Sequence, residues 1–323
     1  MGDLLKGKVA VVTGSGQGIG RAIALGMAGE GAKVVTNNRR RGSTGYVHLK
    51  EKVLKAMSSK QKEWLRKQQE EMAGDAETTA EAIKKMGGEA VPFFGDISDF
   101  EVARKLIQTA VDSFGRIDIL ANVAGTFGFS PIWEMSEELW DKVTLTKPKG
   151  YFNCIRHAVP FMMKQKWGRI INCTSRAFLG DVLKHAEYCA ANAGVVGLTR
   201  AVAKELAQYG ITCNAFAPFA KTRAAYELTA YDEAVSAEDS PWMDRKFRFD
   251  FEMTPSPDDI APFINYLASD EAANINGKVF NVGGSIINLY SEPDMSKTLV
   301  KSGGRWTIDE LRQQIPFAIL PPE

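Results

Sequence analysis

The stretch that most constrains the fold is KVAVVTGSGQGIG, residues 8–20. Residues 9–12 form a short apolar run of the kind that a strand buried on both faces shows. Four glycines then alternate with small or polar residues, and apolar residues follow at helical spacing: Gly14, Gly16, Gly18, Gly20, then Ile19, Ile23 and Met27. Glycine lets the backbone approach a pyrophosphate, and the free N–H groups of a helix's first turn face the anion. The order strand, tight turn, helix therefore predicts a dinucleotide site.

Length and charge exclude several classes of protein. A chain of 323 residues forms one large domain or two. Its 40 basic and 39 acidic residues nearly cancel, which argues against a nucleic-acid or membrane partner. The chain runs directly into the first strand, so we expect no signal peptide and no membrane span. The cysteines have no metal-site spacing, which favours a cytoplasmic protein with reduced thiols and no metal: Cys154, Cys173, Cys189 and Cys213.

The rest of the chain alternates between strand and helix patterns. Strands are expected at 33–37, 90–94, 117–121, 169–173 and 278–281, and helices at 76–86 (with Asp75 as N-cap), 100–114 and 258–268. This order predicts an α/β fold with a single doubly wound parallel sheet, Rossmann-like, formed by residues 1–323 as one domain. Residues 287–323 form a C-terminal extension with a short helical run at 307–314.

Residues 41–74, after the second strand, form a charged helical insertion. Leu49, Val53 and Met57 lie on one helical stripe. Ser58 and Gln61 resemble a capping box that begins a second helix. The insertion is expected to pack on the main body or on a neighbouring subunit, and a mobile surface excursion is equally compatible with the sequence.

Basic residues follow the second strand. In dinucleotide-binding folds an acid at this place binds the ribose hydroxyls, whereas arginine accommodates a 2′-phosphate. Here Asn38 occupies the acid position and Arg39 follows it. The pattern favours NADP(H), and NAD(H) stays possible. The same residues are also compatible with a solvated basic loop that has no role in cofactor binding.

Several motifs resemble, in order, those of the short-chain dehydrogenase/reductase family. They are TGSGQGIG at 13–20, Asp96-Ile97, NVAG at 122–125 and NAFAP at 214–218, and the match continues through Tyr188 to Gly283-Gly284. Together they cover roughly residues 6–40 and 76–286. A second, shorter resemblance, at 218–222 and 306–311, is to the hydroxyacyl-CoA dehydrogenase part of multifunctional β-oxidation enzymes.

The resemblance implies an oxidoreductase that interconverts a ketone and a secondary alcohol and assembles as a homodimer or homotetramer. The cofactor residues that it implies are Gly14, Ser15, Gln17, Gly18, Ile19, Gly20, Asn38, Arg39, Asp96, Ile97, Asn122, Ala124, Gly125, Pro218 and Thr222. Aromatic residues beside the expected crevice, Phe127 and Phe129 among them, favour a bulky or acyl-type small-molecule substrate, although they are equally compatible with ordinary core. His185 is a substrate contact or a surface residue.

The catalytic residues that the resemblance implies include one exchanged pair. Ser175 lies thirteen residues before Tyr188, which is the family spacing, so Tyr188 is the expected general acid/base and Ser175 holds the substrate oxygen. However, Asn192 stands where the family has lysine, and Lys147 stands where it has asparagine. The family lysine holds the nicotinamide ribose and lowers the tyrosine pKa.

Two hypotheses follow from the exchange. Lys147 supplies the missing charge from the facing helix, with Pro148 disrupting the helical hydrogen bonding beside it. Alternatively, Lys147 points to solvent, and the protein is a nucleotide-binding, catalytically weak or inactive relative that acts as a partner subunit. A third class, a scaffold or nucleic-acid protein that uses the charged insertion, has little support in the sequence.

Overall fold

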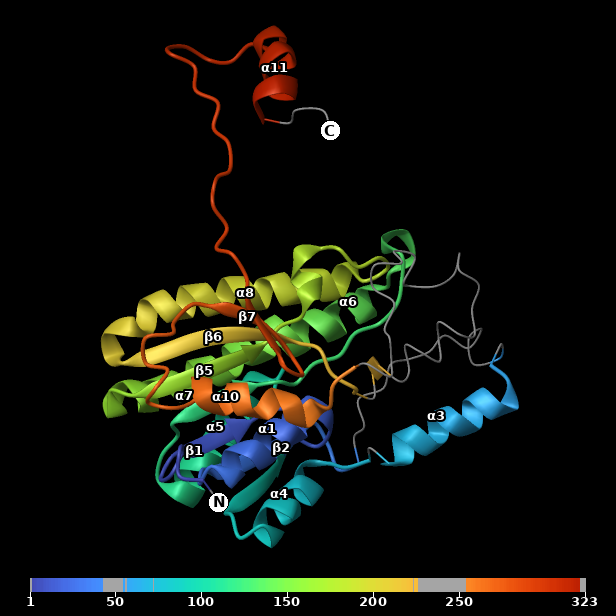
Figure 1. Ribbon diagram of the computed structural model, residues 1–323, viewed down its shortest axis with the longest axis vertical. Coiled ribbons are helices and arrows are strands. Elements are labelled where there is room, and N and C mark those ends of the chain that lie inside the picture. The colour runs from blue at the N-terminus through green and yellow to red at the C-terminus, as the bar shows by residue number, and fades with distance from the viewer. Residues whose placement is uncertain are drawn as a thin grey trace. The chain divides into compact units, whose positions relative to one another are not determined.

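A computed structural model describes residues 2–42, 55, 57–71, 73–222, 224–225 and 254–319. The chain divides into two compact units, Met1–Leu289 and Tyr290–Glu323. Within the described residues, the first unit contains an eight-stranded sheet in the order β3-β2-β1-β4-β5-β6-β7-β8 (Figure 1). Its strands are β1 (Val9–Val12), β2 (Lys33–Asn38), β3 (Ala90–Phe94), β4 (Ile119–Asn122), β5 (Gly168–Cys173), β6 (Ile211–Pro218), β7 (Val279–Gly283) and β8 (Ile286–Leu289). All neighbouring strands are parallel except β7 and β8.

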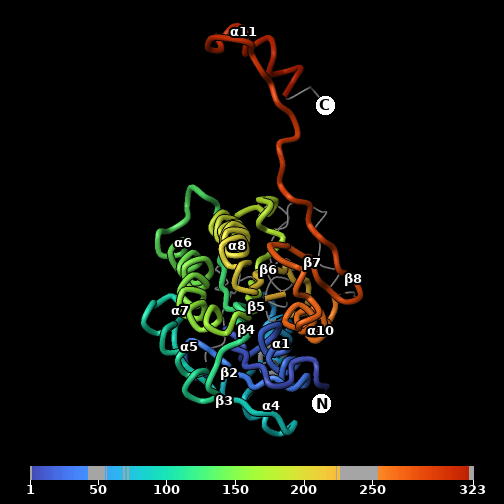
Figure 2. The backbone as a smooth tube through the Cα atoms, turned by 90° about the vertical axis from the view of Figure 1, so that its left-hand side faces the viewer, coloured from blue at the N-terminus to red at the C-terminus, as the bar shows by residue number. Residues whose placement is uncertain are grey.

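Helices cover both faces of the sheet (Figure 2). The helices of the first unit include α1 (Gly18–Gly29), α3 (Ser59–Glu71), α4 (Ala76–Lys85), α5 (Phe100–Phe114), α6 (Glu137–Thr144), α7 (Gly150–Gln165), α8 (Ala186–Leu206) and α10 (Ala261–Leu267), whereas α11 (Ile308–Gln314) belongs to the second unit. Ala10 and Val12 of β1 pack in one core with α1, α4 and α10. Val9 and Val11 pack in the other core with α5, α7 and α8. Both faces of β1 are therefore buried, which is why its sequence is continuously apolar.

The predicted α/β fold is confirmed, and several local signals act as expected. The Asp75 side chain accepts hydrogen bonds from the backbone N–H groups of Glu77 and Thr78 and so caps α4. Helix α5 has the predicted limits. Ser58 and Gln61 form the expected capping box before α3, whereas Leu49 and Val53 lie outside the described residues.

The edge strand β8 was not predicted, since the sequence pattern placed the last strand at 278–281. Ile286–Leu289 pairs antiparallel with β7, and all four residues are exposed. A strand without a buried face has no alternation of apolar and polar residues for the sequence to reveal. The 258–268 segment also differs, because a 3₁₀ turn, Pro257–Ile260, precedes α10.

The second unit, Tyr290–Glu323, contains α11. Thr307 and Glu310 form a capping box at its start, and Lys301 pairs with Glu310 at 2.6 Å. The predicted helical run is thus present in the extension. Among the helices of the described residues, none combines the length and the apolar character that crossing a membrane requires.

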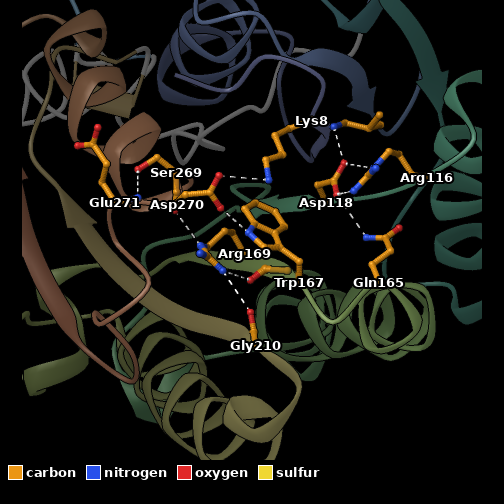
Figure 3. A network of polar contacts seen from close by, with 12 residues as sticks. Lys8, Arg116, Asp118, Gln165, Trp167, Arg169, Gly210, Ser269, Asp270 and Glu271 are labelled. Carbon is orange, nitrogen blue, oxygen red and sulfur yellow. Dashed lines mark hydrogen bonds and ion pairs between the residues drawn. The ribbon is translucent and has the colours of Figure 1, made fainter. Parts of the chain in front are cut away.

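Polar contacts join the amino ends of the strands (Figure 3). The buried carboxylate of Asp118 accepts the backbone N–H of Val9 at 2.9 Å and two hydrogen bonds from Arg116 at 2.6 and 2.7 Å. Nearby, the Trp167 indole N–H donates to Asp270 at 2.6 Å, and Lys8 Nζ lies 3.5 Å from the centre of the Trp167 ring. These contacts hold β1, β4 and β5 at one end, so the carboxyl ends of the strands are presented in fixed register at the other.

Candidate active site

A cleft of about 430 Å³ lies beyond the carboxyl ends of the strands, between the turns that follow them. Most of the predicted site residues line it: Gly14, Gln17, Gly18, Ile19, Gly20, Asn38, Arg39, Asp96, Ile97, Ala124, Gly125, Lys147, Ser175, Tyr188, Pro218 and Thr222. Residues distant in sequence are therefore brought to one edge of the sheet.

The glycine turn fits a dinucleotide phosphate. Gly14 and Gly18 have φ angles of +65° and +48°, a region that L side chains rarely adopt. A Cβ on Gly14 would lie 2.7 Å from the Cα of Ala124, so the glycine turn can approach the turn after β4 this closely only with glycine at position 14. Gln17, at the N-cap of α1, makes no side-chain capping bond, and its Nε2 is buried without a partner among the described residues. The first turn of α1 thus offers N–H donors to an anion.

The end of β2 forms a second part of the cleft, next to the glycine turn. Asn38 Oδ1 is buried and has no hydrogen-bond partner in the described part of the chain. Arg39 lines the cleft with an exposed side chain. Arg41 is engaged elsewhere, because it forms an ion pair with Glu77 and lies 4.7 Å from the ring centre of Phe94. Of these two arginines, Arg39 is the one placed to meet a ligand in the cleft.

Three predicted residues lie behind the cleft wall rather than in it. Ser15 Oγ accepts the backbone N–H of Asn37 at 2.8 Å and ties the glycine turn to β2. Asn122 Nδ2 donates to Asn172 Oδ1 at 2.9 Å, between β4 and β5. The third residue, Asn192, is fully buried behind Lys147. Their contacts fix the backbone and side chains that form the cleft.

Ser175 and Tyr188 come together from the end of β5 and the first turn of α8. Burial raises the pKa of Tyr188 to about 12, although its hydrogen bonds with the Ser175 and Asn192 side chains act in the opposite direction. Burial outweighs these hydrogen bonds, so the depressed pKa that a replacement charge would give Tyr188 is not found. Tyr188 consequently carries its proton at neutral pH and can donate it.

Lys147 points inward, which contradicts the hypothesis that it faces solvent. Its side chain is 3% exposed, and burial lowers its pKa. Nζ donates to Asn192 Oδ1 and to the backbone oxygen of Cys173, both at 2.8 Å, and lies 5.6 Å from the ring centre of Tyr188. Asn192 Nδ2 in turn donates to the Tyr188 backbone oxygen at 2.8 Å. The two exchanged residues are thus in direct contact.

The backbone around Lys147 departs from a regular α-helix. In a regular α-helix Pro148 would lack an N–H donor, and its ring would clash with the carbonyl four residues earlier. A π-helical turn, Leu145–Lys149, accommodates the proline between α6 and α7. Lys147 lies between the buried Val143 and Tyr151 at helical spacing. A Cβ on Gly125 would approach Lys147 Cε to 2.8 Å, so that glycine leaves room for the lysine stem.

Aromatic rings form the wall beside Tyr188. The ring centres of Phe127 and Tyr188 are 5.5 Å apart, and those of Phe129 and His185 are 4.2 Å apart. Phe127 lines the cleft, whereas His185 is 4% exposed and therefore not a surface residue. The neighbouring Glu187 was not predicted, and it is fully buried; a charged residue directly before Tyr188 was the available signal. The aromatic residues at 226–251 lie outside the described residues.

Comparisons with known proteins agree with this geometry. A family model described as short chain dehydrogenase matches residues 8–62 and 55–230. The 3-oxoacyl-(acyl-carrier-protein) reductase FabG of Staphylococcus aureus is 34% identical over 279 residues, covering 86% of this chain and 98% of that protein. The hydroxyacyl-CoA dehydrogenase ChsB1 of Mycobacterium tuberculosis is 31% identical over 316 residues, covering 95% of this chain and 87% of that protein. A crystal structure of a short chain dehydrogenase from Mycobacterium avium superposes with a TM-score of 0.75 at 32% identity, covering 98% of this chain and 96% of that one.

Proposed function

The chain belongs to the short-chain dehydrogenase family, and from this premise we propose that it is an NADP(H)-dependent oxidoreductase that reduces a ketone on a bulky, acyl-type substrate. The observation that carries the proposal is the arrangement of Ser175 and Tyr188 in the cleft, with Lys147 hydrogen-bonded to Asn192 behind them. An acyl-type substrate is favoured by the names of two relatives, a 3-oxoacyl reductase and a hydroxyacyl-CoA dehydrogenase.

The side chains of the site have separate roles in this reaction. A nicotinamide cofactor, when bound, exchanges a hydride with the carbonyl carbon. Ser175 holds the substrate oxygen by a hydrogen bond, and Tyr188 gives its phenolic proton to that oxygen. The Lys147 ammonium stabilises the negative charge left on Tyr188, while Asn192 and the Cys173 carbonyl keep the ammonium in place.

Purified protein tests the proposal in two measurements. NADPH fluorescence reports cofactor binding, and the decrease in NADPH absorbance reports reduction of a 3-oxoacyl thioester. Binding with turnover is the expected result. Binding without turnover would favour the partner-subunit hypothesis, for which the missing lysine at Asn192 is the supporting observation. Absence of binding would contradict both.

We expect Arg39→Ala to remove most of the preference for NADPH over NADH. The Arg39 guanidinium offers a planar donor array to a 2′-phosphate, and a charge-assisted contact of about 1.5–3 kcal/mol corresponds to a preference of roughly tenfold or more. Dissociation constants for both cofactors, measured by fluorescence titration, check the effect. Arg41→Ala is the matched control, because Arg41 pairs with Glu77 and should leave the ratio unchanged. Equal affinities in the unmodified protein would contradict the prediction.

A further inference from the structure

A buried carboxylate lies directly before the acid/base tyrosine and outside the roles described so far. Glu187, in the first turn of α8, is fully buried. Its Oε1 accepts the backbone N–H of Gly128 at 3.1 Å and lies 3.7 Å from His185 Nδ1. Its Oε2 and His185 Nδ1 are buried without a hydrogen-bond partner among the described residues. Burying such groups is unfavourable, so the fold retains them at a cost to stability.

The contacts of Glu187 show what this carboxylate holds. Residues 126–130 follow the turn after β4 and contain Phe127, which lines the cleft. Two hydrogen bonds anchor this segment to the residues just before Tyr188: Gly128 N–H to Glu187, and Ser130 N–H to the Lys184 backbone oxygen at 3.0 Å. Phe127 lies immediately before the first anchor, with its ring centre 5.5 Å from that of Tyr188. The position of Phe127 therefore depends on the start of α8.

We propose that Glu187 is a positioning residue for the substrate: it holds residues 126–130 so that Phe127 forms an apolar wall beside Tyr188 for the longer part of an acyl substrate. His185 supports the same wall, because its ring packs 4.2 Å from that of Phe129 and 5.7 Å from that of Phe127. Glu187 acts through Phe127 and does not touch the reacting atoms. The inference rests on the proposed function for its substrate class, but its structural part is independent of turnover.

The first test needs no activity. Amide hydrogen exchange of the peptide containing residues 126–130 is measured by mass spectrometry in the unmodified protein, Glu187→Ala and Glu187→Gln. Alanine should lower protection of this peptide about tenfold or more, whereas glutamine should retain it, since its amide oxygen still accepts the Gly128 N–H. Glu205→Ala, an exposed position on the same helix, is the control and should change nothing. Unchanged protection in Glu187→Ala overturns the proposal, whatever the enzyme's activity.

The second test concerns specificity and uses two probes, the 3-oxobutanoyl and 3-oxododecanoyl thioesters of N-acetylcysteamine. Glu187→Ala should raise KM for the long probe about tenfold relative to the short one, with NADPH affinity unchanged, and Glu187→Gln should restore the ratio. If the Glu187→Ala variant does not fold, Glu187→Asp is used in its place. Aspartate keeps the carboxylate but is one methylene shorter, which moves the acceptor away from the Gly128 N–H. An unchanged KM ratio in a folded variant overturns the specificity role. Failure of the unmodified protein to reduce either probe would instead count against the proposed function, and the exchange measurement would still decide the positioning role.

Discussion

Replacing Tyr188 with phenylalanine should lower ketone reduction by about 10³-fold while NADPH binding stays within a factor of two, because a positioned acid/base contributes about 10²–10⁴-fold. Burial raises the pKa of Tyr188 to about 12, so its proton is present throughout the neutral range and available to the substrate oxygen. The reduction rate of the unmodified protein should consequently show no loss from Tyr188 ionisation until the pH approaches that pKa. Steady-state reduction rates from neutral to alkaline pH, with NADPH fluorescence on the same samples, check both statements.

The control for Tyr188→Phe is Tyr266→Phe, a change of the same atoms at a partly exposed position on α10. It should leave both rate and binding unchanged. If Tyr188→Phe retains full activity, the proton comes from another group and the proposed acid is wrong. If the unmodified protein and Tyr188→Phe both bind NADPH but neither reduces a ketone, the partner-subunit hypothesis is favoured.

The nucleotide-binding half of the fold could be predicted because its signals are local. Strand β1, the glycine turn and α1 follow one another within residues 9–29, so their order is visible in a short stretch of sequence. The predicted cap of α4 is equally local, since Asp75 accepts hydrogen bonds from N–H groups within the next three residues. Such features depend on neighbours along the chain and not on tertiary packing.

The rest of the site depends on contacts between distant elements. Lys147 and Asn192 are 45 residues apart, and only the packing of the π-helical turn against α8 brings them together. From the sequence, an inward and an outward lysine were both compatible with the helical pattern. Glu187 was missed for a similar reason, because its partner Gly128 is 59 residues earlier and a charged residue in a helix's first turn is ordinarily explained by the helix dipole.

Replacing Lys147 with methionine should lower the rate of alcohol oxidation by about 10²-fold or more and move its alkaline limb to higher pH. In the proposed mechanism, oxidation needs Tyr188 in its tyrosinate form. Because the pKa of Tyr188 is about 12, on the order of one molecule in 10⁵ carries a tyrosinate at pH 7. The Lys147 ammonium lies 5.6 Å from the centre of the Tyr188 ring, so its removal makes the tyrosinate still rarer. Reduction uses the protonated form and should suffer less, so the protein is expected to favour reduction in its natural state. Lys149→Met, an exposed lysine on the same π-helical turn, is the control.

The double exchange Lys147→Asn with Asn192→Lys should recover much of the oxidation rate that Lys147→Met loses, because the two side chains already touch and the ammonium would return from the opposite helix.

Asn192→Lys alone places two ammonium groups at the same buried position and should lower thermal stability, since like charges there have no water to screen them. The pH profile of oxidation and the melting temperature of all three variants separate these effects. An unchanged profile in Lys147→Met would mean that the ammonium takes no part in the chemistry. Activation of an otherwise silent protein by Asn192→Lys would make the partner-subunit hypothesis the better one.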